Sequence, residues 1–173
     1  MVSLQITRII KCTENIRQKK TLKVYAKGKI GDKYFKTNTV DLESNQRADS
    51  QKIELEFDKD NIDDYIKRIK DIKLHAKSFM EDYTKDLNKA YKERDYKRIE
   101  SYIKKDSDLE KHMRSMVEGK TKNQYKRPEF ESVDYNDGRV NVVLKKENQE
   151  KEMIKSKYIL KYNEADESFM ILS

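Results

Sequence analysis

Apolar and polar positions alternate through the first third of the chain, which is the pattern of half-buried strands. Residues 22–27 and 34–40 alternate in this way and are separated by a turn at Gly31-Asp32. Residues 52–58 show the clearest alternation of this part and follow a polar loop over residues 42–51. These segments predict a small β-rich, sandwich-like domain over residues 1–59.

The period changes at Asp60, where apolar residues begin to recur at helical intervals up to Tyr91. The pattern fits one helix, and it equally fits two helices with a break near Asp71. Residues 60–73 are expected to form a helical connector between two domains. A second helix is predicted over residues 96–103.

A third helix is predicted to begin at Ser107. Ser107 and Glu110 have the spacing of a capping box, in which the two side chains bond to opposite backbone amides of the first turn. Gly119 is expected to end this helix as a left-handed cap.

Beyond Pro128 the period returns to two, which predicts an antiparallel sheet. Asn136-Asp137-Gly138 is a strong signal for a type I′ hairpin turn, because that turn needs positive φ. Strands are expected on both sides of it, then a charged loop over 145–151 and strands near 158–162 and 169–172. Helices followed by a meander predict an α+β domain over residues 74–173, with a curved sheet that makes it cone-shaped.

The distribution of charge suggests a first candidate function, the binding of a polyanion. The chain has 173 residues, of which 41% are charged and 35% hydrophobic, and a formal net charge of +7. Basic residues concentrate in residues 8–36 and 111–127, and such fields attract polyanions. The alternative is the solvated surface of a lysine-rich protein. The candidate polyanion-binding residues are Arg17, Lys19, Lys20, Lys23, Lys27, Lys29, Lys120, Lys122, Lys126 and Arg127.

Tyrosines suggest a second candidate site, because many of them fall in the C-terminal half. In a cone-shaped domain their phenols could line a pocket for a sugar or a peptide. The competing interpretation is that tyrosine replaces phenylalanine in a lean core. The candidate pocket residues are Tyr83, Tyr102, Tyr135, Tyr158 and Tyr162.

The sequence offers no recognised catalytic, cofactor or metal motif. Cys12 is the single cysteine, and neither His75 nor His112 has a partner at a metal-binding spacing. We therefore expect no catalytic residues, no cofactor and no metal. No apolar run is long enough to span a membrane, so any membrane anchor is expected outside this chain. Lysines interleaved with aromatics near Tyr25 and Tyr34 leave a basic nucleic-acid-binding protein as an alternative, although no specific nucleic-acid motif is present.

A family resemblance rests on the helical region and the strand before it. Residues 79–83, 87–91, 94–96 and 99–103 look like the opening of a nuclear-transport-factor-2-like domain. More narrowly, they resemble the extracellular C-terminal domain of the teicoplanin-resistance-associated, or TcaA-like, membrane proteins of Gram-positive bacteria. Residues 52–57, followed by 62–66, are similar to the end of the preceding β-rich domain in that family.

The resemblance implies a place and a role. The family combines a cytoplasmic zinc ribbon, one membrane span and several extracellular domains, and is linked to wall teichoic acid, peptidoglycan and the response to glycopeptide antibiotics. This sequence lacks the ribbon and the span. We expect a non-catalytic binding or scaffolding module at the extracellular face of the membrane or in the cell wall, with anionic wall polymer as its partner. A cytoplasmic location is expected if the resemblance fails, and a small cone-fold enzyme or ligand-binding domain is the other alternative.

Overall fold

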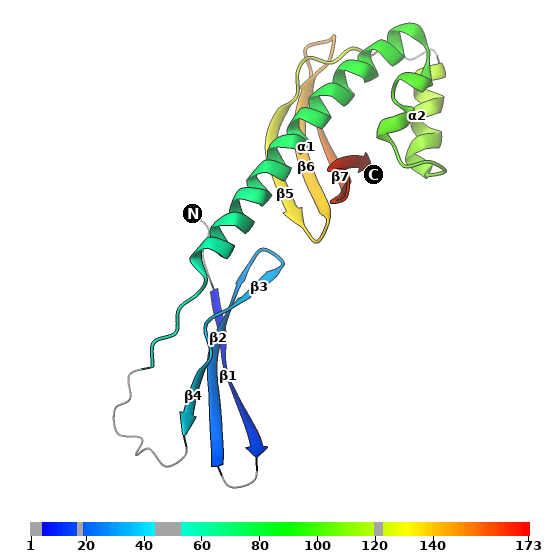
Figure 1. Ribbon diagram of the computed structural model, residues 1–173. Helices are drawn as coiled ribbons and strands as arrows, with labels where there is room; N and C mark the ends of the chain where they lie inside the picture. Colours follow the sequence, from blue (N-terminus) through cyan, green and yellow to red (C-terminus); the bar gives the residue numbers. More distant parts are fainter. Residues whose placement is uncertain (1–4, 17–18, 44–52, 120–122) are drawn as a thin grey trace. The chain divides into compact units, whose positions relative to one another are not determined.

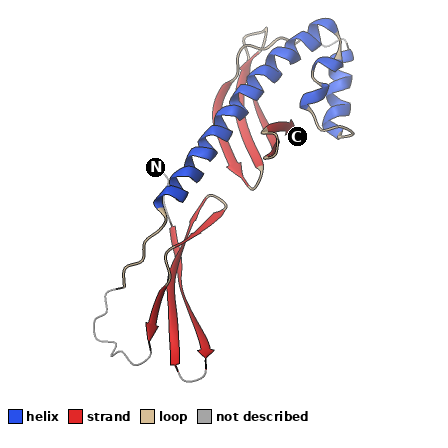
Figure 2. Ribbon diagram, viewed as in Figure 1, coloured by secondary structure: helices blue, strands red, loops and turns tan. Residues whose placement is uncertain are grey.

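The computed structural model describes residues 5–16, 19–43, 53–119 and 123–173, and for residues 5–16, 19–22 and 43 it describes the backbone only. The chain divides into two compact units, residues 1–67 and 68–173. The fold class is α+β, as predicted: an N-terminal sheet, then helices followed by a second antiparallel sheet (Figures 1 and 2).

The N-terminal unit is an antiparallel sheet built around one long strand. Its described strands are β1 (Gln5–Ile16), β2 (Lys19–Ile30), β3 (Lys33–Lys36) and β4 (Val40–Glu43). Strand β1 pairs with one edge of β2, whereas β3 and β4 pair with successive parts of the other edge. The strand predicted over residues 34–40 is therefore divided. At the division, the buried Thr37 accepts a hydrogen bond from the Ala26 amide through its hydroxyl, at 2.8 Å.

The strand predicted over residues 52–58 is not formed as a regular strand. In the described residues 53–58, only Phe57 makes a β-bridge, to Thr37. The side chain of Asn38 takes over the pairing instead: its Oδ1 accepts from the Glu56 amide at 2.8 Å, and its Nδ2 donates to the Glu54 carbonyl at 3.3 Å. A side-chain amide can substitute for a backbone hydrogen-bond partner in this way. The alternating apolar and polar residues of this segment are therefore held against the sheet without a continuous ladder of backbone hydrogen bonds.

Helix α1 runs without a break from Lys59 to Glu93, so the possible interruption near Asp71 does not occur. The boundary between the two compact units falls within this helix. Its C-terminal part buries a stripe of apolar residues at spacings of three and four, namely Ile72, Ala76, Met80, Tyr83, Leu87, Ala90 and Tyr91. Ala76 and Ala90 are fully buried.

The predicted helix over residues 96–103 is two short 3₁₀ turns, Tyr96–Arg98 and Glu100–Tyr102. Ile99 lies between them with φ −121°, outside the helical range, and is fully buried. Arg94 before them adopts φ 55°, and Asp95 caps the first turn by accepting from the Lys97 amide. The buried Ile99 thus interrupts the helix that the apolar spacing of residues 96–103 had predicted.

Helix α2 (Asp108–Glu118) begins at the predicted capping box. The Ser107 hydroxyl accepts from the Glu110 amide at 3.1 Å, while the Glu110 carboxylate accepts from the backbone amide of Asp106. The left-handed cap predicted at Gly119 is wrong, since its φ is −74°. Space explains this glycine instead: a Cβ there would lie 2.8 Å from the Ser115 carbonyl oxygen.

The second sheet is a four-stranded meander in the order β5–β6–β7–β8. Its strands are β5 (Glu129–Asn136), β6 (Arg139–Glu147), β7 (Met153–Asn163) and β8 (Ser168–Ile171). The predicted hairpin is confirmed, with φ of 48° at Asp137 and 71° at Gly138. The predicted loop over 145–151 is shorter, because β6 continues to Glu147. Helix α1 crosses this sheet, and the core of the unit lies between them (Figure 2).

Candidate functional site

Several predicted polyanion-binding residues lie outside what the structure describes. Arg17, Lys120 and Lys122 are not among the described residues, and the side chains of Lys19 and Lys20 are not described. Lys126 and Arg127 are placed, and each contacts a carboxylate: Lys126 Nζ lies 2.6 Å from Glu147 Oε1, and Arg127 Nη2 lies 2.9 Å from Glu81 Oε1. Their positive charges are thus partly neutralised within the domain.

The remaining three, Lys23, Lys27 and Lys29, lie at alternate positions of β2 and therefore on one face of the sheet. The opposite face is buried through Val24, Ala26 and Ile30. Strand β3 adds two further side chains to the exposed face. We call this set the basic sheet face: Lys23, Tyr25, Lys27, Lys29, Tyr34 and Lys36.

Two lysines of the basic sheet face lie directly opposite each other. Lys27 of β2 pairs in register with Lys36 of β3. Both ammonium groups lie over the ring of Tyr25, at 5.9 Å for Lys27 and 4.0 Å for Lys36, and Lys29 lies 5.2 Å from the ring centre of Tyr34. Like charges opposite each other destabilise a sheet, and the aromatic rings offset part of that repulsion.

The five predicted pocket tyrosines all belong to the core of the C-terminal domain but do not line one pocket. Tyr83 contacts Tyr102 and Tyr158, with ring centres 5.5 and 6.2 Å apart, and Tyr135 contacts Tyr162 at 6.3 Å. Phe79 and Phe169 connect the two groups. The Tyr102 hydroxyl donates to Asp86 at 2.8 Å. Of the five, Tyr83 and Tyr158 line a cavity.

This cavity, which we call the tyrosine pocket, has a volume of about 350 Å³. Helices α1 and α2 and strands β6 and β7 contribute its walls, together with Tyr125 from the segment before β5. The described lining residues are Tyr83, Leu87, Tyr91, Leu109, His112, Met113, Met116, Tyr125, Lys146, Ser156, Lys157, Tyr158 and Ser173. The walls are thus mostly aromatic and apolar, and they contain no Asp or Glu side chain among these residues.

Lys146 is the unexpected member of the tyrosine pocket, since its exposed fraction is only 4%. Its Nζ donates to the Tyr158 hydroxyl at 2.7 Å and lies 4.7 Å from the ring centre of Tyr125. Sequence reasoning missed it by assigning residues 145–151 to a loop. The available signal was the alternation of Val140, Val142 and Leu144, which points the next even residue inward.

Burial keeps the phenols of Tyr83, Tyr91 and Tyr125 protonated by raising the pKa of each. Burial raises the pKa of Tyr125 to about 12 and that of Tyr83 well above its ordinary value. Burial also raises the pKa of Tyr91, and a hydrogen bond with Asn123 counteracts part of this effect. The pocket therefore offers neutral hydroxyl groups and apolar walls around the Lys146 ammonium.

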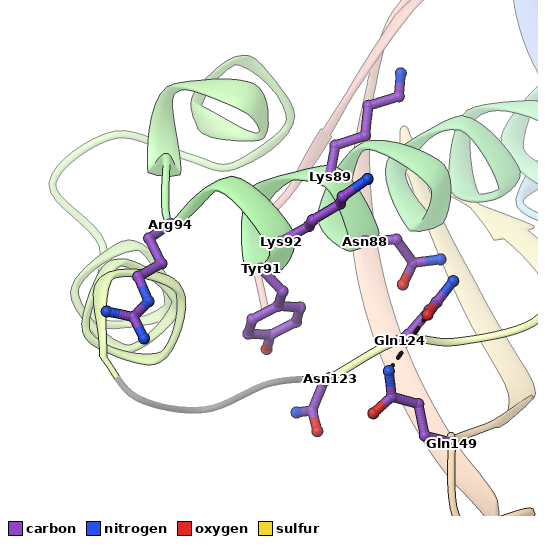
Figure 3. A pocket seen from close by; sticks show the side chains of 8 residues that line it. All are labelled: Asn88, Lys89, Tyr91, Lys92, Arg94, Asn123, Gln124 and Gln149. Carbon is purple, nitrogen blue, oxygen red and sulfur yellow. Dashed lines mark hydrogen bonds between the residues drawn. The ribbon is translucent and has the colours of Figure 1, made fainter.

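A second cavity, the amide pocket, lies at the end of α1 and has a volume of about 510 Å³ (Figure 3). Its described lining residues are Asn88, Lys89, Tyr91, Lys92, Arg94, Asn123, Gln124 and Gln149. Asn88 is held by the backbone of Tyr125 through two hydrogen bonds of 2.7 and 2.8 Å, and Gln149 donates to Gln124 at 3.3 Å. Amides with nearby cations suit a ligand that carries hydroxyl groups and negative charge.

No group of carboxylates, histidines and cysteines that could hold a metal occurs within the described part of the chain. Its helices likewise include none that is both long and apolar enough to cross a membrane.

The buried polar or charged residues that the structure describes are Thr37, Thr84 and Lys146. Thr84 donates to the Met80 carbonyl within its own helix, which leaves Lys146 as the buried group facing a cavity.

A helical segment packed on a curved antiparallel meander, with a cavity between them, defines the nuclear-transport-factor-2-like class of domains. Comparison with known families matches residues 72–173 to the TcaA protein NTF2-like domain. The match spans more than half of the chain, and the chain belongs to this family. No curated protein and no solved structure matches it.

Proposed function

We propose that this chain is a non-catalytic binding module of a bacterial cell-envelope protein and that its ligand is an anionic wall polymer such as teichoic acid. Membership of the TcaA family supports an envelope role, and the proposed location is the extracellular face of the membrane or the wall. The observation that carries the proposal is the Lys27–Lys36 pair, two opposed cations over the Tyr25 ring on an exposed sheet face.

A strand face suits a repeating polyanion. Side chains on one face of a strand recur every two residues, about 6.6 Å apart, so Lys27 and Lys29 can contact successive negative groups of an extended chain. Tyr25 and Tyr34 present rings beside these cations, and Tyr34 is 60% exposed. Aromatic faces stack on sugar rings, which many wall polymers carry in addition to phosphate.

The amide pocket supports the same ligand class from the C-terminal domain. Lys92 and Arg94 supply positive charge, and Gln124 and Gln149 supply donors and acceptors for hydroxyl groups. Figure 3 shows Gln124 and Gln149 joined to each other, while Lys92 and Arg94 project from the end of α1. A polyol phosphate offers both kinds of group that this lining recognises.

The proposal is tested by titrating purified wall teichoic acid into the protein at increasing salt. Affinity is expected to fall steeply with salt, because contacts between exposed charges are screened over a Debye length of about 8 Å at physiological ionic strength. The double variant Lys27→Gln, Lys36→Gln should reduce affinity by about tenfold or more at low salt. A charge-neutral soluble glycan should not bind.

The matched control removes the same charge elsewhere. Lys85 and Lys111 are exposed lysines on α1 and α2 that lie outside both pockets, so Lys85→Gln, Lys111→Gln should retain most of the affinity. A salt-independent affinity, or equal losses in the two double variants, would overturn the role of the basic sheet face. Single-stranded DNA of matched charge serves as the comparison for a general polyanion: equal binding to DNA and teichoic acid would contradict a wall-specific ligand.

A further inference from the structure

The burial of Lys146 is the starting point. Lysine is among the residue types least often buried, because taking its ammonium out of water is costly without a paired charge. In this domain Lys146 follows Val140, Val142 and Leu144 on the inward face of β6, all three of them fully buried. An apolar residue would satisfy the packing of that position at lower free-energy cost.

The bonding of Lys146 is incomplete. An ammonium carries three N–H donors. Among the residues that the structure describes, Tyr158 supplies its one hydrogen-bond acceptor, and no carboxylate lies within ion-pair distance. The rings of Tyr125 and Tyr158, at 4.7 and 5.3 Å, offset part of the lost hydration. Two donor directions of the ammonium therefore remain for a ligand.

The other lining residues of the tyrosine pocket indicate the chemistry of the part of the ligand that does not contact Lys146. Leu87, Leu109, Met113 and Met116 give the tyrosine pocket apolar walls, and Tyr83 and Tyr125 add ring faces. His112 and Lys157 are exposed lining residues, so the pocket is accessible from solvent on their side. A volume of about 350 Å³ accommodates a compact organic molecule rather than a polymer.

We propose that the tyrosine pocket binds a small organic anion, with its carboxylate or phosphate on Lys146 Nζ and its aromatic or apolar body against the tyrosine rings and methionines. This site is separate from the polymer-binding function proposed above. Of the described lining residues, only Tyr91 is shared with the amide pocket, and the basic sheet face belongs to the other compact unit. Either proposal can fail without the other.

Methionine methyl groups provide a direct readout. The chain has six methionines, of which Met113 and Met116 line the tyrosine pocket, while the exposed Met153 and Met170 lie on β7 and β8. With ¹³C-methyl methionine, benzoate and phenyl phosphate are titrated into the full chain, and benzyl alcohol and benzylamine serve as neutral and cationic controls. We expect one or both anions to shift the Met113 and Met116 signals while Met153 and Met170 stay in place.

Variants of Lys146 make the result specific. Lys146→Met keeps an unbranched side chain, one heavy atom shorter, and removes its charge. It should weaken anion binding by about tenfold or more, as expected for losing a hydrogen bond to a charged group worth roughly 1.5–3 kcal/mol. Lys146→Arg should retain measurable binding. Lys155→Met, on the same sheet but outside the pocket, is the matched control and should bind as the wild type does.

Each possible result of these titrations either supports the proposal or contradicts it. Shifts with phenyl phosphate alone, or with benzoate alone, support the proposal and identify the head group. No shift of Met113 and Met116 with either anion overturns it, as do equal shifts with benzyl alcohol. Anion affinity unchanged in Lys146→Met also overturns it. A Lys146→Met protein that fails to fold leaves the wild-type titration and Lys146→Arg to decide.

Discussion

The Lys146 ammonium lies 2.7 Å from the Tyr158 hydroxyl, and Lys146 occupies a position of β6 where alternation places apolar side chains. If the ammonium is retained for a ligand, it should not be needed for stability. We expect Lys146→Met to raise the free energy of unfolding by about 1 kcal/mol, because replacing a desolvated charge with a packed apolar group is often stabilising. Chemical denaturation checks this expectation, and a loss of more than about 1 kcal/mol would assign Lys146 a structural role.

The Lys27–Lys36 pair predicts opposite effects on stability and on binding. Lys36→Glu replaces a repulsion across β2 and β3 with an attraction, and should stabilise the N-terminal sheet by about 0.5 kcal/mol. The same change should weaken binding of teichoic acid more than Lys36→Gln does. Thermal unfolding and the polymer titration measure the two effects. If Lys36→Glu binds as tightly as the wild type, the pair does not contact the polymer.

Asn38 should be important for attaching residues 53–58 to the N-terminal sheet. Asn38→Ala removes the hydrogen bonds from its side chain to the backbone of Glu54 and Glu56, and should cost about 1–2 kcal/mol. Amide hydrogen exchange at Glu56 should accelerate in the variant. Asn136→Ala, in the exposed hairpin of the other unit, is the control for general effects of losing an asparagine, and it should leave exchange at Glu56 unchanged.

Arg94 ends α1 in the left-handed region, with φ 55°. Glycine adopts this conformation without steric cost, so Arg94→Gly should preserve stability or raise it by up to about 1 kcal/mol. It also removes a cation from the amide pocket, and we expect weaker polymer binding at low salt. Lys97→Gly, on the neighbouring exposed turn, is expected to be destabilising and to leave binding intact. Weaker binding by both variants would point to the loss of local order instead.

Stability should fall in alkaline solution through phenols that are fully or partly buried. Burial raises the pKa of Tyr96, Tyr102 and Tyr125 to about 12, whereas an unfolded tyrosine titrates near 10. Their contribution is fully present below pH 10 and is lost as the pH rises from 10 to 12, because the unfolded chain ionises first. Melting temperature measured across this range, together with tyrosinate absorbance, checks the sign. Tyr102→Phe should reduce the dependence.

Sequence patterns determined the features that depend on neighbouring residues. The Asn136-Asp137-Gly138 turn, the capping box at Ser107 and the helical stripe of α1 all formed, because local backbone preferences and periodic burial specify them. The order of helices and meander then followed from short connections, and with it the α+β class. Helices α1 and α2 and the hairpin of the second sheet were therefore predictable from the printed sequence.

The tertiary structure decided what depends on contacts between distant residues. Asn38 replaced a strand ladder over 53–58, and burial of Ile99 broke a predicted helix into two turns. The two-residue period alone could not reveal that Lys146 points into a cavity, because that cavity exists only where α1, α2 and the sheet meet. Likewise, Lys27 and Lys36 became a pair only through the register of β2 and β3. Local preferences specified the turn, the cap and the long helix, whereas packing and strand register decided which charged side chains lie in a cavity or opposite one another.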